Sequence, residues 1–198
     1  MKKLFFAVAG LIYLSACSSG PTSKVVVMAS GKVSAEGNVV TLDPGTTHNE
    51  ISFETSEKSI TLKNGENSQQ LELPSCGLYI LNVKNDTIVG SYQKTGTEVT
   101  QEVITQESLA QRIDSLHQLM QGTNVTTANR NYNIPPNRII KITDNLQADI
   151  IGPYLRVPAS FEPGKEYEIY KFYTNKEVRE IADKLTGMLS KESEDTEN

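Results

Sequence analysis

The sequence predicts an α+β protein, in which an N-terminal antiparallel β-sandwich-like part precedes a smaller part with two amphipathic helices and about three strands. Three observations predict this class. Between residues 24 and 103, short runs of alternating apolar and polar residues are separated by Gly, Pro and Asn turn signals. After residue 104, apolar residues recur at helical spacing in two stretches. Between these stretches lie β-branched and aromatic runs that are typical of strands.

The β part, residues 24–103, begins with the apolar run 25–29. Period-two alternation, which indicates a strand with one buried face, recurs at 51–53, 60–62 and 71–73. Asn64-Gly65 predicts a tight hairpin turn. A second hairpin is expected between residues 78–83 and 87–92, around Asn85-Asp86.

The α+β part, residues 104–190, contains both helices. The first is expected to end at Gly122, and its apolar face consists of Leu109, Ile113, Leu116 and Met120. Strands are expected at 139–142, 148–157 and 167–173, with a turn at 161–165 between the last two. Thr174 and Glu177 have the spacing of a capping box and predict the start of the second helix. Residues 191–198 are charged and are expected to form a disordered tail.

The polar segment 123–137 carries five asparagines and the pair Pro135-Pro136, so it predicts a binding loop or a mobile connection. Arg130, Tyr132 and Arg138 are the candidate ligand-binding residues, because cations beside an aromatic ring can receive a carboxylate, a phosphate or a sugar. The alternative is that the asparagines bond their own loop and the arginines pair with acids. Convergence of the three on a concave pocket with buried carboxylates would favour a hydrolase; scattered placement would favour a binding module.

Composition excludes several classes. The formal charge of -5, without a basic block, argues against nucleic acid as a partner. No cofactor or metal site is expected, because the sequence has no Gly-rich phosphate loop and no Cys-x-x-Cys or His-Glu-x-x-His motif. His48 and His117 are the only histidines, and no catalytic residue is singled out. The many carboxylates leave a two-carboxylate hydrolase open.

The first twenty residues indicate where the protein is located. Lys2 and Lys3 precede an apolar run at 4–14, which is the pattern of a secretory signal and is about half the ~20 residues of a spanning helix. The run ends in Leu14-Ser15-Ala16-Cys17, which resembles the lipobox of bacterial lipoproteins. The resemblance implies a signal peptide at 1–16, a lipidated Cys17 and a tether at 17–23. Ser18 after the cysteine implies the outer membrane in a Gram-negative host.

With Cys17 acylated, Cys76 is the only remaining thiol, and we expect it to be a small buried hydrophobe in a turn. Residues 60–83 resemble the edge of prealbumin-like and PEGA-type envelope modules, which supports a β-sandwich and implies no functional residue. Asp86-Thr87-Ile88 resembles an acceptor of envelope O-glycosylation, so Thr87 is a candidate for that modification.

The expected function is therefore that of a membrane-anchored cell-envelope lipoprotein, acting as a non-catalytic binding or assembly module. Its expected partners are the membrane, through the N-terminal lipid, and an envelope protein or glycan. The alternatives are an envelope hydrolase acting on glycan or peptide, and a purely structural envelope protein.

Overall fold

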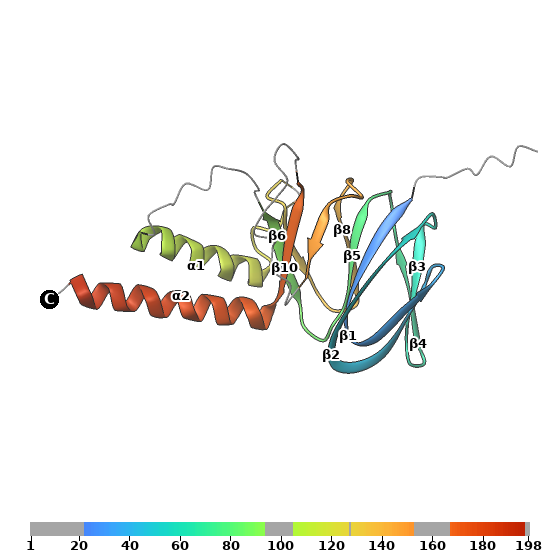
Figure 1. Cartoon of the computed structure of the whole chain (residues 1–198), viewed down its shortest axis with the longest axis horizontal. Helices are drawn as coiled ribbons and strands as arrows, with labels where there is room; N and C mark the ends of the chain where they lie inside the picture. Colours follow the sequence, from blue (N-terminus) through green and yellow to red (C-terminus); the bar gives the residue numbers. More distant parts are fainter. Residues whose placement is uncertain (1–21, 94–104, 127, 153–166, 197–198) are drawn as a thin grey trace, which may run out of the picture.

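The computed structural model describes residues 22–93, 105–126, 128–152 and 167–196, with side chains as far as Ser190. The predicted signal peptide, Cys17 and the predicted turn at 161–165 lie outside these residues. The described chain forms two β-sheets and two helices (Figure 1).

Sheet A contains six strands in the order β4-β3-β2-β1-β5-β8, and sheet B contains four in the order β7-β6-β10-β9. The strands of sheet A are β1 (Ser23–Glu36), β2 (Val39–Thr55), β3 (Ser59–Asn64), β4 (Asn67–Glu72), β5 (Leu78–Val83) and β8 (Arg138–Thr143). Those of sheet B are β6 (Ile88–Gln93), β7 (Asn131–Ile134), β9 (Asp149–Ile151) and β10 (Ile169–Thr174). The helices are α1 (Gln106–Gln121) and α2 (Asn175–Thr196).

The α+β class with a β-rich part is confirmed, but the sheets are mixed and not antiparallel throughout. β1 runs parallel to β5, β2 to β3, and β9 to β10. The reason lies in β1 and β5, which are apolar at consecutive positions and must be covered on both faces. β1 and β5 lie next to each other inside sheet A, where a core cluster covers each face of the sheet.

Side chains of β1 and β5 alternate between two core clusters. Val25, Val27 and Leu81 belong to the first cluster, which sheet A encloses as it curls. Val26 and Ile80 belong to the second, which also contains residues of β6, β7 and β10. The second cluster therefore joins sheet A to sheet B, and the first fills the concave side of sheet A.

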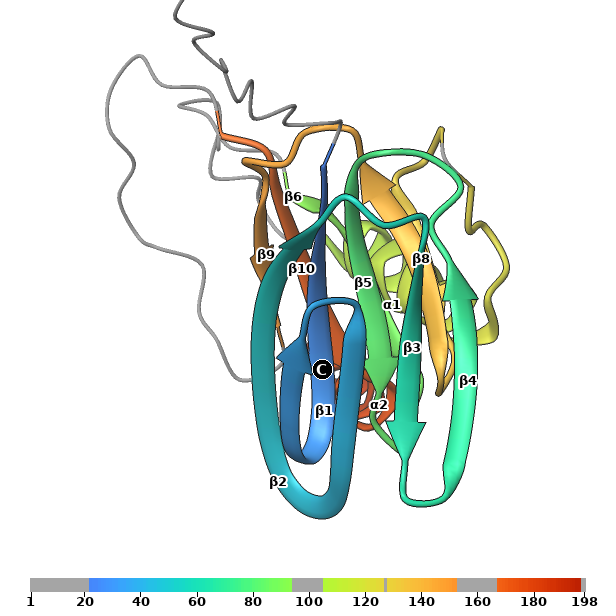
Figure 2. The ribbon, with the colours of Figure 1, turned by 90° about the vertical axis from the view of Figure 1, so that its right-hand side faces the viewer.

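Sheet A is nearly barrel-like because the β1–β2 ribbon is bent (Figure 2). The strands continue through Gly31 and Pro44, although glycine and proline are turn signals, and their register shifts between Ser30 and Gly31. Gly31 has a φ of 113°, and a Cβ there would lie 2.1 Å from the carbonyl oxygen of Asp43. Only glycine allows this close approach, which bends the ribbon.

The predicted hairpin between residues 78–83 and 87–92 is wrong, because β5 belongs to sheet A and β6 to sheet B. The side chain of Asn82 holds the chain where it passes from sheet A to sheet B. Its buried amide donates to the carbonyls of Asp86 and Ile134, at 2.9 and 2.8 Å, and accepts the N–H of Lys84. Strand β8 returns to sheet A, so neither sheet follows the predicted division at residues 103/104.

The first helix ends and the second begins where predicted. Thr105 and Ser108 cap α1, and Gly122 ends it with a φ of 69°. At α2, Glu177 Oε2 accepts the N–H of Thr174 at 2.7 Å, which completes the predicted capping box. Helix α2 runs to Thr196, so the predicted disordered tail is helical through that residue.

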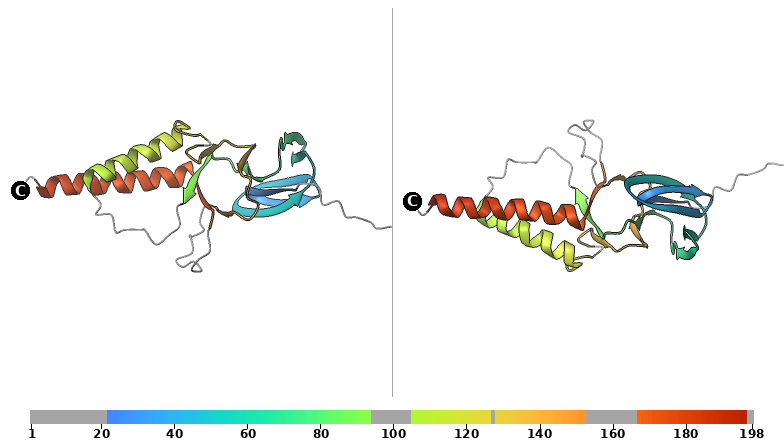
Figure 3. Two further views of the ribbon diagram at one scale, coloured as in Figure 1. Left: turned by 90° about the horizontal axis from the view of Figure 1, so that it is seen from above. Right: turned by 90° about the horizontal axis from the view of Figure 1, so that it is seen from below.

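The helices lie against each other and contact sheet B through β6, β7 and β10. They project from sheet B at the end of the molecule opposite the start of β1 (Figure 3). The long axis therefore has the start of β1 at one end and the helix pair at the other.

Candidate functional site

Arg130 lies just before β7 with a left-handed φ of 51°, and its carbonyl accepts the N–H of Tyr92 at 3.1 Å. Its guanidinium stacks on the Tyr92 ring, 4.0 Å from the centroid. Nη2 donates to Tyr170 Oη at 2.6 Å and to Glu168 Oε1. A positive φ is uncommon outside glycine, so these contacts hold the backbone in a sparsely populated conformation.

Glu168 is the acceptor that organises this group. It also accepts hydrogen bonds from Tyr170 Oη at 2.6 Å, from Thr143 Oγ1 at 2.9 Å and from Asn145 Nδ2 at 2.8 Å. We call Glu168, Arg130, Tyr170, Thr143 and Asn145 the Glu168 clasp. It joins the segment before β7, the end of β8 and the start of β10.

Hydrogen bonds and charges within the clasp shift the pKa values of its own groups. Burial alone would raise the pKa of the Glu168 carboxyl, but hydrogen bonds from Tyr170, Asn145 and Thr143, with the charge of Arg130, lower it. Burial and donation to Glu168 raise the pKa of Tyr170. The carboxylate and the phenol are thus both held in the forms that bond each other.

Tyr132 is a core residue and not a surface ligand-binding residue. It is 7% exposed, and its hydroxyl donates to the carbonyl of Ile142 at 2.6 Å. Its ring packs edge-on against Tyr170, with centroids 5.8 Å apart. Its position on a strand of sheet B, one face of which packs on sheet A, explains why it is buried.

Arg138 lies away from the other two candidates. It begins β8 opposite Asn82, whereas Tyr132 bonds Ile142, four residues further along that strand. Four residues of strand span about 13 Å. The structure thus brings Arg130 and Tyr132 into one neighbourhood and places Arg138 at the opposite end of β8.

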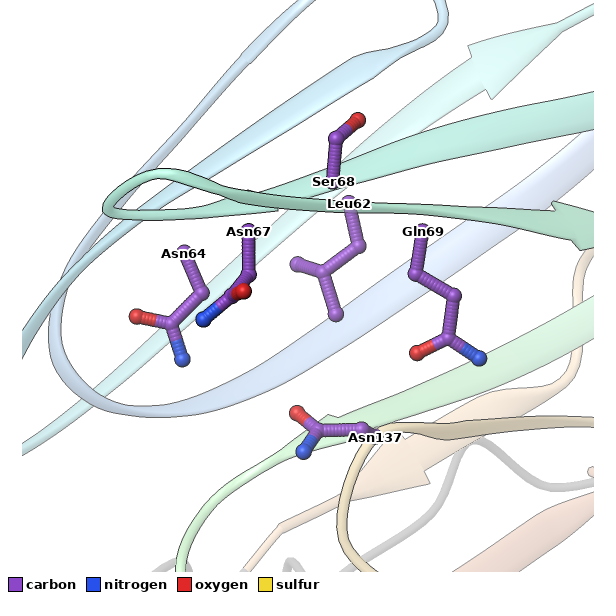
Figure 4. Close-up of a pocket in the computed structure, with 6 residues that line it drawn as sticks. All are labelled: Leu62, Asn64, Asn67, Ser68, Gln69 and Asn137. Carbon is purple, nitrogen blue, oxygen red and sulfur yellow. The ribbon is translucent and has the colours of Figure 1, made fainter.

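A different polar site lies beside Arg138, at the mouth of curled sheet A. A cavity of about 250 Å³ lies between the β3–β4 hairpin and the residue before β8 (Figure 4). We call it the amide cavity; it is lined by Leu62, Asn64, Asn67, Ser68, Gln69 and Asn137.

Strand register explains why the amides converge. Asn64 pairs with Asn67, and Leu62 pairs with Gln69. Paired residues, and residues two apart, share one face of a sheet. That face is the concave side of sheet A, whose deeper positions are the apolar core residues Ile60 and Leu71. The inner face therefore changes from apolar to amide towards the hairpin turn.

None of the four amide side chains in the cavity bonds another of the residues that the structure describes. By contrast, the amide of Asn82 bonds two carbonyls, and that of Asn133 donates to two carbonyls at the end of α1. This site was not predicted, because Asn64 was expected only to form a turn. The available signal was a pair of uncharged amides at alternate positions, Asn67 and Gln69, after a turn that begins with a third amide, Asn64.

A buried charged group lies near the start of α2. Lys84 is 6% exposed, and burial lowers its pKa, while the carboxylates of Glu177, Glu50 and Asp86 act to raise it. Burial raises the pKa of Glu50 and lowers that of His48. Asp86, in the β5–β6 turn, accepts the backbone N–H of Lys176 through its Oδ2 atom. This hydrogen bond attaches the start of α2 to that turn.

Two side chains that the sequence drew attention to, Cys76 and His117, lie at the surface. Cys76 is exposed, so its assignment as a buried hydrophobe was wrong. His117 is exposed on α1. Within the described ranges no three His, Cys, Asp or Glu residues are grouped as a metal ion would require. No helix among those residues is both long and apolar enough for a membrane span.

Comparisons with models of protein families, with curated proteins and with solved structures found no match to this chain.

Proposed function

We propose that this protein is a lipid-anchored cell-envelope protein that acts as a non-catalytic binding or assembly module, with the amide cavity as its binding site. The observation that carries the proposal is the convergence of four amide side chains without internal partners on one cavity. A polar group that bonds nothing inside the protein remains available to a ligand.

The placement of the sequence candidates favours binding over hydrolysis. Arg130 is held by Glu168, Tyr132 lies in the core, and Arg138 is at the other end of β8. A hydrolase would need its polar groups to converge where a reacting atom can sit. The three residues do not share such a place.

The proposed anchor and the site lie at opposite ends of sheet A. Ser23 pairs with Thr55, and β3 starts at the same end four residues later. Strand β3 then runs six residues, about 20 Å, to the amide cavity. The predicted tether was 17–23, but Ser23 already belongs to β1, so the proposed tether ends before it. With Cys17 acylated, the cavity would face away from the membrane. Ser18 supports the outer membrane as its location.

We also propose a sandwich-like description of the β part. Residues of both sheets share the second core cluster, which supports two packed layers with sheet A curling beyond them.

The anchor is tested by metabolic labelling with radioactive palmitate. We expect the wild-type chain to be labelled and to enter the outer-membrane fraction, and Cys17→Ala to be unlabelled. Cys76→Ala is the matched control, because it removes the other thiol and should keep the label. Equal labelling of the wild type and Cys17→Ala would refute the anchor.

The binding site is tested with a photo-reactive amino acid at position 69 or 70 in intact cells. Adjacent strand residues point to opposite faces, so position 69 reports on the cavity and position 70 on the outer face. We expect covalent adducts from position 69 only. Equal yields from both positions would contradict the proposed site.

A further inference from the structure

We propose that the amide cavity binds an uncharged sugar unit of a glycan. This inference rests on the proposed binding function and names its ligand class. Four amides, Asn64, Asn67, Gln69 and Asn137, line the cavity with the side chain of Leu62 between them (Figure 4).

The amides match vicinal hydroxyls. Each amide offers two N–H donors and a carbonyl that accepts. A sugar hydroxyl both donates and accepts, so one amide can satisfy one or two hydroxyls without any charge. Carboxylates would accept only, and lysines would donate only. Four amides around one cavity therefore suit a ligand that carries several hydroxyls in a fixed arrangement.

Leu62 forms the apolar floor of the cavity. It is 3% exposed and belongs to the core cluster within sheet A. Because almost all of Leu62 is buried in that core, it closes the floor of the cavity, and a sugar placed there would be bound mainly by the amides. The lining residues carry no formal charge, so the cavity has no dedicated partner for a phosphate or a carboxylate.

Position and size agree with this ligand class. The mouths of β-barrels are preferred ligand sites. The volume of about 250 Å³ is below the range of roughly 300–1,000 Å³ for drug-sized ligands, so the cavity accommodates about one sugar ring. A small, polar ligand in an open cavity binds weakly, and we expect a Kd of about 1 mM for one unit. Many anchored copies on one surface would strengthen binding to a polymer.

Asn137 links the two sides of the cavity. It has a φ of 57°, and its N–H donates to the carbonyl of Asn82 at 2.7 Å. That bond fixes the backbone of Asn137 across from the β3–β4 hairpin. The site is therefore built from segments more than sixty residues apart in the sequence.

The experiment is a titration of the whole isotopically labelled protein, followed by NMR of the side-chain NH₂ signals. The probes are glucose, galactose, mannose, N-acetylglucosamine, glucuronate, inorganic phosphate and a neutral tetra-alanine amide. We expect a neutral sugar to shift the signals of Asn64, Asn67, Gln69 and Asn137 saturably, and phosphate to leave them unchanged.

Matched variants locate the site. Gln69→Ala should weaken sugar binding about tenfold, because two hydrogen-bonding groups are lost from the cavity. Gln70→Ala should leave it unchanged, since Gln70 is on the other face and bonds Ser59 Oγ. Both variants should keep the wild-type spectrum elsewhere, which confirms that they are folded.

The outcomes separate this inference from the proposed function. Binding of the peptide or of phosphate at these amides, with no sugar binding, would refute the glycan and keep the binding module. Equal sugar affinity in Gln69→Ala and Gln70→Ala would refute the site. If no probe shifts these signals at about 20-fold the expected Kd and position 69 captures nothing in cells, both proposals fail.

Discussion

The Glu168 clasp and the amide cavity are both polar groups at the edges of the two β-sheets, but they differ in where their hydrogen bonds go. In the clasp, one carboxylate accepts from Arg130, Tyr170, Thr143 and Asn145. In the cavity, three amides of the β3–β4 hairpin lie across from Asn137, and none of the four bonds a described residue. The first group completes the fold, and the second leaves its bonding groups to solvent or to a ligand.

This difference shows that residue type alone does not reveal function. Arginine beside tyrosine is a common recognition pair, and here it is a structural contact that fixes the start of β7. Asparagine near a glycine is a common turn pair, and here Asn64 also lines a cavity. We therefore expect substitutions in the clasp to lower the free energy of unfolding, and substitutions in the cavity to lower the affinity for the ligand.

The largest effect is expected for a fully bonded amide. Asn82 is 0% exposed and makes three hydrogen bonds that direct the chain from β5 to β6. Asn82→Ala should lower the free energy of unfolding by about 3 kcal/mol, because two carbonyls and an N–H lose partners in the interior. Urea denaturation measures it. A loss below about 0.5 kcal/mol would show that the fully bonded amide of Asn82 contributes no more to stability than an amide without internal partners.

The next effect concerns the centre of the clasp. Glu168→Ala should destabilise by about 2–3 kcal/mol, because Tyr170 and Arg130 lose their shared acceptor. Glu72→Ala, at an exposed position of β4, is the matched control and should stay within about 0.5 kcal/mol of wild type. Equal effects of the two substitutions would show that the clasp contributes nothing to stability.

Acid should remove the same contribution. The pKa of Glu168 is lower in the folded chain than its unfolded value of about 4.3. Its stabilisation is therefore present above that value and is lost as pH falls through the folded pKa. The difference in unfolding free energy between wild type and Glu168→Gln should shrink between pH 5 and about pH 2. A difference that is constant with pH would mean that the charge is unimportant.

A smaller effect separates the two candidate arginines. Arg130→Met keeps packing on Tyr92 but loses the bonds to Glu168 and Tyr170, and should cost about 1 kcal/mol because the side chain is 38% exposed. Arg138→Met should have almost no effect on stability, because Arg138 is exposed. Thermal denaturation of both variants tests this. A larger loss in Arg138→Met would reverse our assignment.

The smallest effect on stability is expected in the cavity. Gln69→Ala should change the free energy of unfolding by less than about 0.5 kcal/mol, because Gln69 has no internal partner. The same substitution carries the predicted loss of sugar binding. Destabilisation comparable to Glu168→Ala would place Gln69 among the structural residues.

Local features were predicted well. The hairpin turn at Gly65, the caps at Thr174 and Glu177, and the stop at Gly122 are all present. Each depends on residues within a few positions of one another, so the chain specifies them without the rest of the fold.

Non-local features were not predicted. The bend at Gly31 reflects a close approach to Asp43 in the neighbouring strand. The redirection at Asn82 depends on a carbonyl at Ile134, fifty-two residues later. Neither partner can be identified from the residues adjacent in sequence.

The sequence by itself determined the α+β class, the positions of most strands and both helices, and the lipobox pattern on which the proposed anchor rests. The tertiary structure decided which strands share a sheet, and it placed Tyr132 in the core and Arg138 beside the amide cavity. The physical reason is that periodicity and caps act over one or two turns of chain. Whether a polar group is bonded or available depends instead on partners that folding brings from distant positions.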